Sequence, residues 1–327
     1  MEDITFLKFI IKKKYLKRSN KLIKKNFIIF FIYIIILITF IILFYYIINF
    51  KKKIFILYEN IFKINNKIPK IIAISYANKK YQRQLILNKK TAIEVGKVDE
   101  YYSYGPNDID KDFRKKNIDI LSRKRGNGYW LWKPYFIYKT FKEKLKEGDY
   151  LIYTDAGILY MNSTSKIIEF LKKQNAEMWM IQLNKTIEKK FTKRDAFILL
   201  GADSPFYTDT DQFMAGIQVY RKSKYTQKFL EELLYYSQDK RIITDDQNTQ
   251  GLKNYKEFYD NRHDQTVLSL LIKKYGEANS GKTNINIDII KKNKIEMPYI
   301  FCIYRRIKFK NYTDILNKCI NYIKNRK

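Results

Sequence analysis

Residues 148–157 read GDYLIYTDAG, and this stretch indicates the class of fold. Residues 150–153 form a short, uninterrupted run of apolar and aromatic side chains, which is typical of a strand buried on both faces of a sheet. The small residues that follow Asp155 end the strand and leave its carboxylate at the tip. Asp155 is therefore either an ordinary turn residue or part of a site.

The segment before this strand predicts a helix. Ile137, Phe141 and Leu145 recur every four residues on one face, as in an amphipathic helix. Pro134 suits the first helical turn, and Gly148 suits a position just past the helix end. The lysines between them are predicted to form the solvated face of this helix.

Strand and helix patterns alternate along the rest of the chain. Strands are predicted at 70–78, 98–105 and 177–183, and helices at 81–96 and 164–175. This alternation favours an α/β fold with a mixed, mostly parallel sheet and flanking helices. Because such folds bind ligands beyond the carboxyl ends of their strands, Asp155 stands where chemistry is expected.

The N-terminal part predicts a membrane anchor. Residues 27–48 are almost entirely apolar and long enough to span a bilayer as a helix. We expect a cytoplasmic basic segment at 1–26, a transmembrane signal anchor at 27–48, a stem at 49–68 and one domain at 69–327. The basic side chains of 1–26 favour a type II-like, single-pass orientation. Since residues 51–53 are also lysines, the side of the membrane on which the domain lies stays open.

The composition narrows the range of partners. The formal net charge is +31, from 64 Lys and Arg against 33 Asp and Glu. The cations are spread along the whole chain among Ile, Asn and Tyr, so we expect no nucleic-acid partner, although a basic surface attracts anionic headgroups and phosphorylated molecules. With two cysteines and one histidine, a zinc site is not expected. Any metal would be a hard cation held by oxygen.

One motif is predicted to be a coincidence. GEANSGKT at 276–283 fits the phosphate-binding P-loop pattern. A P-loop lies between a preceding strand and a following helix, whereas here a helical pattern at 266–275 precedes it and a strand-like INIDII at 285–290 follows. We therefore expect a turn.

Five segments, in order, resemble the nucleotide-sugar glycosyltransferases of the GT-A type, particularly small enzymes of capsular and surface polysaccharides. They cover about half of the chain and are RGNGYWLWKPY (125–135), GDYLIYTDAG (148–157), FTKRDAF (191–197), DQFMAGIQVYRKS (211–223) and HDQTVLSLL (263–271).

The resemblance implies a GT-A-like fold and a metal site. In that family an acidic D-x-D motif ends a strand and binds the metal and the sugar nucleotide, which places Asp155 as the ligand of Mn²⁺ or Mg²⁺. The second acidic position is Gly157 here, so metal dependence stays open. The donor-binding residues that the resemblance implies are Trp130, Trp132, Lys133, Asp155, Gly157, Lys193, Asp195, Gln212, Gly216, His263 and Gln265.

The chemistry adds requirements of its own. Sugar–phosphate cleavage needs a cation beside the departing diphosphate, for which Arg125 and Lys133 are candidates. An inverting transfer needs a carboxylate base, and Asp155 aside, the candidate catalytic residues are Asp211, Asp264 and Asp246. Simpler roles compete: core packing for the two tryptophans, a helix N-cap for Asp264, a surface ion pair for Lys193–Asp195.

We therefore expect a membrane-anchored glycosyltransferase with a nucleotide-sugar donor and a glycan or glycolipid acceptor, in surface polysaccharide or glycoconjugate synthesis. Two alternatives remain. One is a membrane-tethered polyanion-binding module, suggested by the charge, and the other is an inactive glycosyltransferase-like protein, suggested by Gly157.

Overall fold

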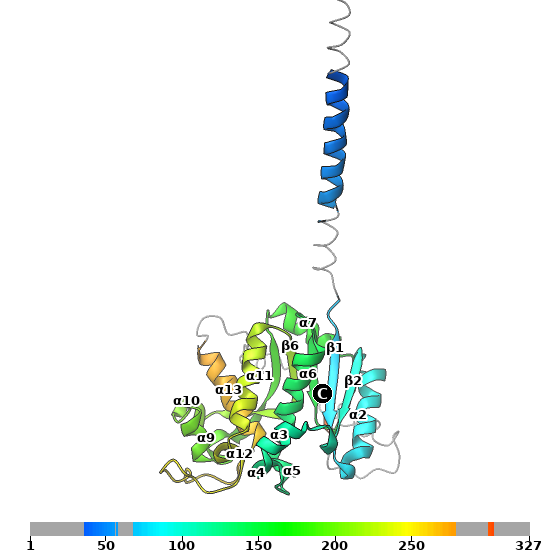
Figure 1. Cartoon of the computed structure of the whole chain (residues 1–327). Helices are drawn as coiled ribbons and strands as arrows, with labels where there is room; N and C mark the ends of the chain where they lie inside the picture. Colours follow the sequence, from blue (N-terminus) through cyan, green and yellow to red (C-terminus); the bar gives the residue numbers. More distant parts are fainter. Residues whose placement is uncertain (1–35, 56, 58–67, 279–299, 304–327) are drawn as a thin grey trace, which may run out of the picture. The chain divides into compact units, whose positions relative to one another are not determined.

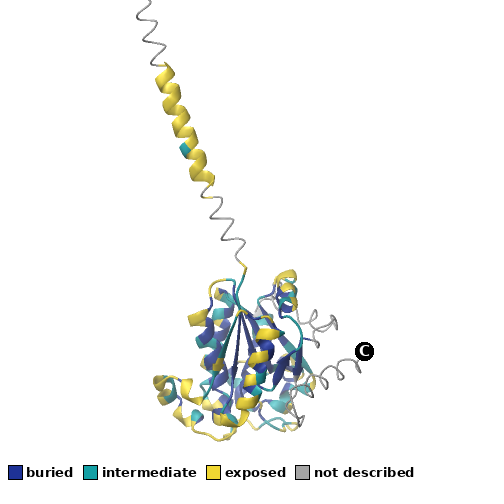
Figure 2. Cartoon of the chain, turned by 90° about the vertical axis from the view of Figure 1, so that its right-hand side faces the viewer, coloured by how far each residue is buried: buried dark blue, intermediate teal, exposed yellow. Residues whose placement is uncertain are grey.

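The computed structural model describes residues 36–55, 57, 68–278 and 300–303. The chain divides into two compact units, Met1–Ile68 and Pro69–Lys327. In the first, residues 36–55 are helical, and their apolar side chains are almost all exposed (Figure 2). Among the described residues, no helix has both the length and the apolarity needed to cross a membrane. Residues 27–35 of the expected anchor lie outside the described part of the chain.

The second unit is an α/β domain built on two sheets (Figure 1). Its strands are β1 (Ile71–Tyr76), β2 (Glu100–Tyr104), β3 (Tyr150–Thr154), β4 (Ile158–Tyr160), β5 (Met178–Ile187), β6 (Asp211–Arg221) and β7 (Phe301–Ile303). Its longer helices are α2 (Gln82–Glu94), α6 (Trp132–Lys144), α7 (Ser165–Lys173), α11 (Lys224–Ser237) and α13 (Asp264–Ala278). The shorter ones are η1 (Lys79–Tyr81), η2 (Pro106–Asp108), α3 (Lys111–Lys116), α4 (Ile118–Leu121), α5 (Gly126–Tyr129), α8 (Glu188–Phe191), α9 (Arg194–Leu199), α10 (Pro205–Thr208) and α12 (Lys240–Ile243).

The main sheet has the strand order β2-β1-β3-β6-β5. β1 pairs with β2 and β3 in parallel, whereas β6 runs antiparallel to both β3 and β5. Four strands therefore share one direction, which confirms the mixed, mostly parallel sheet. Their carboxyl ends lie at one edge, together with the beginning of β6.

β3 is central because it is apolar on both faces. Leu151 and Tyr153 pack into the core on one face of the sheet, with side chains of α6, α11 and α13. Tyr150 and Ile152 pack into the core on the other face, with side chains of α2 and α7. Figure 2 shows these strands buried between the helices. The alternation follows from the two-residue period of a strand.

The structure confirms Pro134 in the first helical turn and corrects the predicted end of the helix. α6 begins at Trp132, so that Pro134 stands at its third position, where its missing N–H costs no helical hydrogen bond. The helix ends at Lys144, and Leu145 is already extended. Gly148 instead occupies the turn into β3, with φ of +87°, a conformation that glycine adopts without strain.

The P-loop-like segment follows a helix. α13 runs to Ala278 and thus covers the first residues of GEANSGKT, so no strand precedes the motif. The strand expected after it lies outside the described residues.

Candidate active site

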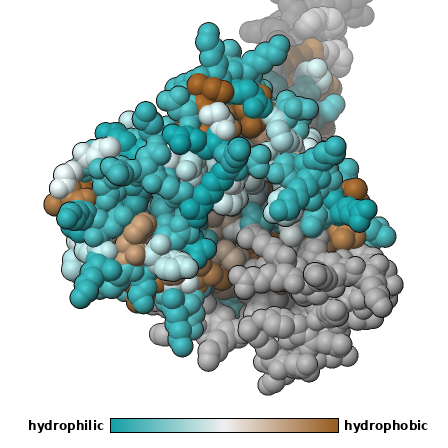
Figure 3. Space-filling model, turned by 90° about the horizontal axis from the view of Figure 1, so that it is seen from below, coloured by the Kyte–Doolittle hydropathy of each residue, from teal (hydrophilic) through white to brown (hydrophobic). Residues whose placement is uncertain are grey.

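Asp155 lies at the edge of the sheet where the carboxyl ends of the parallel strands meet. β3 ends at Thr154, which pairs with Ile217 of β6, and residues 211–216 of β6 extend beyond that point. The edge points downward in Figure 1, and Figure 3 views the molecule from that side, where the visible described residues are largely hydrophilic. The position of Asp155 is therefore that of a ligand-binding residue in an α/β fold.

A buried lysine joins Asp155 to a second carboxylate. The Nζ of Lys133 lies 2.6 Å from Oδ2 of Asp264 and 3.3 Å from Oδ1 of Asp155. The lysine is 4% exposed, Asp264 7%, and the side chain of Asp155 18%. The three residues come from α6, the first turn of α13 and the end of β3. We call them the Lys133 cluster.

Further contacts fix the Asp155 carboxylate and its backbone. The Tyr153 hydroxyl donates to Oδ1 of Asp155 at 2.6 Å, and the Asp155 N–H donates to the carbonyl of Gly216 at 2.9 Å. The amide of Asn88, a fully buried residue of α2, donates to Thr154 Oγ1 and to the Ile158 carbonyl. The turn that carries Asp155 is thus fixed by α2, and the partly exposed side chain of Asp155 lies at the edge of the sheet.

The backbone of Ala215 and Gly216 closes the site from the side of β6. The Ala215 carbonyl accepts from Lys133 Nζ at 3.4 Å, and its N–H donates to Gln265 Oε1 at 3.3 Å. The Gln265 amide in turn donates to Gln212 Oε1 at 2.8 Å. The predicted residues Lys133, Asp155, Gly216, Asp264 and Gln265 are therefore brought together.

The charges of the Lys133 cluster leave an excess of negative charge. One ammonium lies between two carboxylates, and burial raises the pKa of Asp264, an effect that the Lys133 ammonium partly offsets. The net charge of the cluster is thus −1 when both carboxylates are ionised. Such a cluster binds a diphosphate poorly by itself, and it suits an additional cation.

The residues around Asp155 fit an ion brought in chiefly by phosphate. Mg²⁺ is commonly bound by one or two carboxylates, with the remaining ligands from substrate phosphates and water. Asp155 supplies one such carboxylate, and Gly157 supplies no side chain. Among the described residues no group of three or more His, Cys, Asp or Glu is arranged to hold a metal ion. The available metal ligands therefore suit an ion that is shared with a substrate.

The approach to the cluster contains strained aromatic residues. Tyr129, Trp130 and His263 have φ of +52°, +60° and +55°, values that are unusual for bulky side chains. The His263 ring lies against both others, with centroid distances of 4.9 Å to Tyr129 and 5.3 Å to Trp130. Backbone strain of this kind concentrates at functional sites, where the surrounding structure maintains it.

His263 is buried beside the cluster and held in place. Its Nδ1 lies 2.8 Å from the Ile243 carbonyl, and its Nε2 lies 3.8 Å from Oδ1 of Asp245. Burial lowers the pKa of His263, although its contact with the Ile243 carbonyl and the charge of Asp245 act in the opposite direction.

Several predicted donor residues lie in the core or support loops. Trp132 is 6% exposed and stacks on Tyr76 at 3.8 Å, and Gln212 is fully buried against Glu188. Lys193 donates to the Asp246 carbonyl at 2.6 Å. Asp195 accepts from the backbone N–H groups of residues 249 and 250. These contacts give each residue a structural role, while their assignment to the donor stays a prediction.

Asp211 lies at the far end of β6. Its Oδ1 accepts from the Thr186 N–H at 2.7 Å. It precedes Ile217, the partner of Thr154, by six positions, which corresponds to roughly 20 Å of strand. That separation is too large for Asp211 and Asp155 to contact the same sugar.

Sequence reasoning missed Asn88, Tyr153 and the link between Lys133 and Asp264. Tyr153 had a signal, because residues two apart on a strand share a face. Asn88 had a weaker one, as a polar residue on the buried side of a helix. The ion pair joins distant segments, and nothing local in the sequence indicates it.

A scan against protein-family models and a search of curated proteins found no match. Three of the solved structures that match this chain are glycosyltransferases. They are the bifunctional glycosyltransferase WbbM (11% identity, TM-score 0.40), the galactosyltransferase LgtC with donor and acceptor sugar analogues (12%, 0.39) and mouse xyloside xylosyltransferase 1 (9%, 0.38).

The matches cover 79%, 78% and 64% of this chain, and 50%, 95% and 83% of those structures, respectively. The chain thus spans half of the WbbM structure.

Because Lys133 is shared by two carboxylates, we expect its replacement to lower the free energy of unfolding strongly. Lys133→Met leaves the buried carboxylate of Asp264 and the partly buried one of Asp155 without their shared cation, which costs about 3 kcal/mol or more of unfolding free energy. Adding Asp264→Asn removes one of these charges and should recover part of that loss. Denaturant unfolding of both variants measures this. Lys139→Met, at a more exposed ion pair with Asp110, is the control and should cost less than about 1 kcal/mol. An equally small loss for Lys133→Met would contradict the role of the cluster.

We expect the free energy of unfolding to depend on pH through His263. The effect can be assigned to this residue because it is the chain's one histidine. Its pKa is lower in the folded protein than the usual value near 6.5, so the unfolded state binds the proton more readily. Stability is therefore fully present above about pH 6.5 and decreases as the pH falls below it. The imidazole resonances in an NMR titration should give a pKa under 6.5, and His263→Asn should reduce the slope of unfolding free energy against pH. A pKa at or above 6.5 would refute this.

Proposed function

We propose that this chain is a glycosyltransferase that moves a sugar from a nucleotide-sugar donor to a glycan or glycolipid acceptor, in the synthesis of surface polysaccharide or glycoconjugate. The observation that carries the proposal is the placement of Asp155. It lies at the open edge of the sheet, fixed by Tyr153, Lys133 and Gly216, at the position that the sequence resemblance gives to the metal- and donor-binding carboxylate.

The proposed reaction breaks the bond between the sugar and the diphosphate. Asp155 would hold Mn²⁺ or Mg²⁺, which when bound supplies positive charge to the departing diphosphate. Lys133 keeps the Asp155 carboxylate in place and adds a fixed positive charge nearby. Trp130, partly buried at the approach, is suited to cover the donor. Pre-positioned charge of this kind usually accounts for a large share of rate enhancement.

An acceptor hydroxyl must lose its proton during transfer. Of the three candidate bases, Asp211 is roughly 20 Å along β6 from the end of β3, and Asp264 is buried against Lys133. Asp246 has a side chain 44% exposed and lines a cavity formed by the loop before α13. Asp246 is therefore the candidate best placed to meet an acceptor from solvent.

The donor reaction gives a direct test of Asp155. The full chain in detergent is incubated with a panel of nucleotide sugars and Mn²⁺ or Mg²⁺, and release of the nucleoside diphosphate is measured. One donor should be turned over, and Asp155→Asn should lower its rate at least about 100-fold, as is common when an electrostatic group at the reacting centre is lost.

Asp119→Asn, an exposed carboxylate on α4, is the matched control and should leave the rate unchanged. Full turnover by Asp155→Asn would remove Asp155 from the mechanism. Steeply salt-dependent binding of acidic polymers without turnover of any donor would favour the polyanion-binding alternative.

We also propose that residues 27–48 anchor the chain in a membrane. The support is the apolar sequence, the basic residues before it and the exposed apolar side chains of the described helix at 36–55. The orientation proposed is a single-pass, type II-like one.

Charged substitutions test this anchor. Leu37→Asp with Ile41→Asp should release the chain from the membrane fraction under alkaline extraction, because each charge near the middle of a span costs roughly 2.5–3.5 kcal/mol. Ile54→Asp, on the same helix but beyond residue 48, is the control and should stay in the membrane. Retention of the double variant would contradict the anchor.

A further inference from the structure

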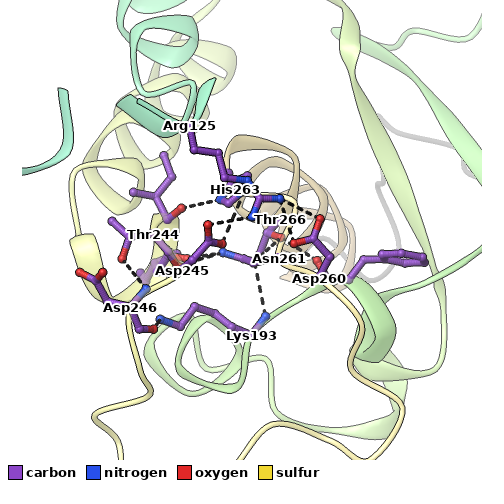
Figure 4. A network of polar contacts seen from close by, with 12 residues as sticks. Arg125, Lys193, Thr244, Asp245, Asp246, Asp260, Asn261, His263 and Thr266 are labelled. Atoms are coloured by element: carbon purple, nitrogen blue, oxygen red, sulfur yellow. Dashed lines mark hydrogen bonds and ion pairs between the residues drawn. The ribbon is translucent and has the colours of Figure 1, made fainter. Parts of the chain in front are cut away.

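A cavity of about 780 Å³ is lined in part by Asp245, which lies 3.8 Å from His263, the sequence neighbour of Asp264. It is formed by the loop at 244–262, between α12 and α13, together with Arg125 and Lys193 (Figure 4). Its volume falls in the range of pockets that bind small molecules. No residue of its lining belongs to the Lys133 cluster.

The loop around the cavity is long but fixed. It has no helix or strand over residues 244–262, and loops of this length in compact domains are usually functional. Asp195 accepts from the N–H groups of Thr249 and Gln250 at 2.7 and 3.1 Å, and Asn261 donates to the Ile242 carbonyl at 3.1 Å. A loop held in this way loses little entropy when a ligand binds.

Arg125 joins this loop to the aromatic segment before α6. Its Nη2 contacts both oxygens of Asp260 at 2.9 Å, and its Nη1 contacts Asp245 at 2.9 Å (Figure 4). Charge-assisted contacts of a guanidinium to two carboxylates fix the geometry of both partners. One wall of the cavity is therefore rigid and presents carboxylate oxygens.

The lining is polar and electrically balanced. Its ionisable side chains are Arg125, Lys193 and Lys253 against Asp245, Asp246 and Asp260, and its other polar side chains include amides. The formal charges cancel, whereas the whole chain carries +31. A polyanion or a diphosphate would find no excess of positive charge here. Closely spaced donors and acceptors without net charge match a neutral molecule rich in hydroxyl groups.

An exposed aromatic ring completes the lining. Tyr259 is 81% exposed, and its N–H is held by the Lys190 carbonyl at 2.8 Å. An aromatic ring with an open face offers apolar contact to the C–H face of a sugar, while its hydroxyl is available for polar contact. Leu252, 48% exposed, adds a further apolar contact.

The cavity is linked to Asp155 indirectly, through a chain of contacts and one peptide bond. Asp245 in its lining lies 3.8 Å from His263 Nε2, the next residue is Asp264, and Lys133 joins Asp264 to Asp155. We infer that this cavity binds the saccharide acceptor, as a neutral sugar unit, next to the donor held at Asp155. The inference rests on the proposed function for its role in transfer, but the binding of a neutral saccharide is testable separately.

Binding is measured on the full chain in detergent by saturation-transfer NMR. The probes are neutral methyl glycosides of glucose, galactose and N-acetylglucosamine, their disaccharides and, as an anionic probe, a heparin tetrasaccharide. We expect at least one neutral probe to bind and Tyr259→Ala and Leu252→Trp to weaken its binding at least tenfold. Tyr235→Ala, at a tyrosine of α11 that is 71% exposed, should leave binding unchanged.

Three outcomes would overturn the inference: no neutral probe binds, only the heparin fragment binds, or Tyr259→Ala and Leu252→Trp bind as the unmodified chain does. Circular dichroism of each variant confirms folding. In the donor assay, both cavity variants should raise the acceptor KM while hydrolysis of the donor by water stays unchanged. Saccharide binding without turnover of any donor would refute the proposed function and leave the inference standing.

Discussion

The structure depends on one buried cation shared between two carboxylates. Lys133 reaches Asp155 at the end of β3 and Asp264 at the start of α13, and its ammonium is almost entirely removed from water. Because an unpaired charge in that position is costly, the central strand, α6 and α13 are held in one arrangement. The same contact fixes the carboxylate at the open edge of the sheet, so that stability and the geometry of the site share one cause.

Two neighbouring regions with different electrostatics follow from this arrangement. The Lys133 cluster has a net negative charge and suits a cation that arrives with phosphate. The cavity beside it is balanced in charge and suits a neutral polar ligand. His263 and the strained residues Tyr129 and Trp130 lie between them. A donor that carries a diphosphate and an acceptor that carries hydroxyl groups would thus be separated by charge within one site.

The elements that sequence patterns predicted well are those whose signal is local. β3 could be recognised because four consecutive apolar residues are buried on both faces, and α13 because its apolar residues follow the helical period. Asp155 could be predicted to lie at the strand end because the apolar run stops there and small residues follow Asp155. The C-terminal end of α6 was predicted less well, since Leu145 fits the helical period and yet is extended.

What sequence patterns could not show are contacts between distant segments. Lys133 was predicted as a helper for a diphosphate, and its pairing with Asp264 depends on the placement of α6 and α13, which both pack against α11. Arg125 was predicted in the same role, whereas its guanidinium is paired with Asp245 and Asp260. Trp132 and Trp130 have similar sequence surroundings, but one is packed on Tyr76 in the core and the other lies beside His263.

The proposed placement of the donor at Asp155 is tested most directly by a crystal structure of the chain with a nucleotide sugar that it turns over. We expect the diphosphate to lie at the carboxyl end of β3, within ligand distance of Asp155 or of an ion bound to it. The sugar should point toward the cavity at 244–262. A donor bound elsewhere on the domain, with Asp155 making no contact to it or to its ion, would refute this placement.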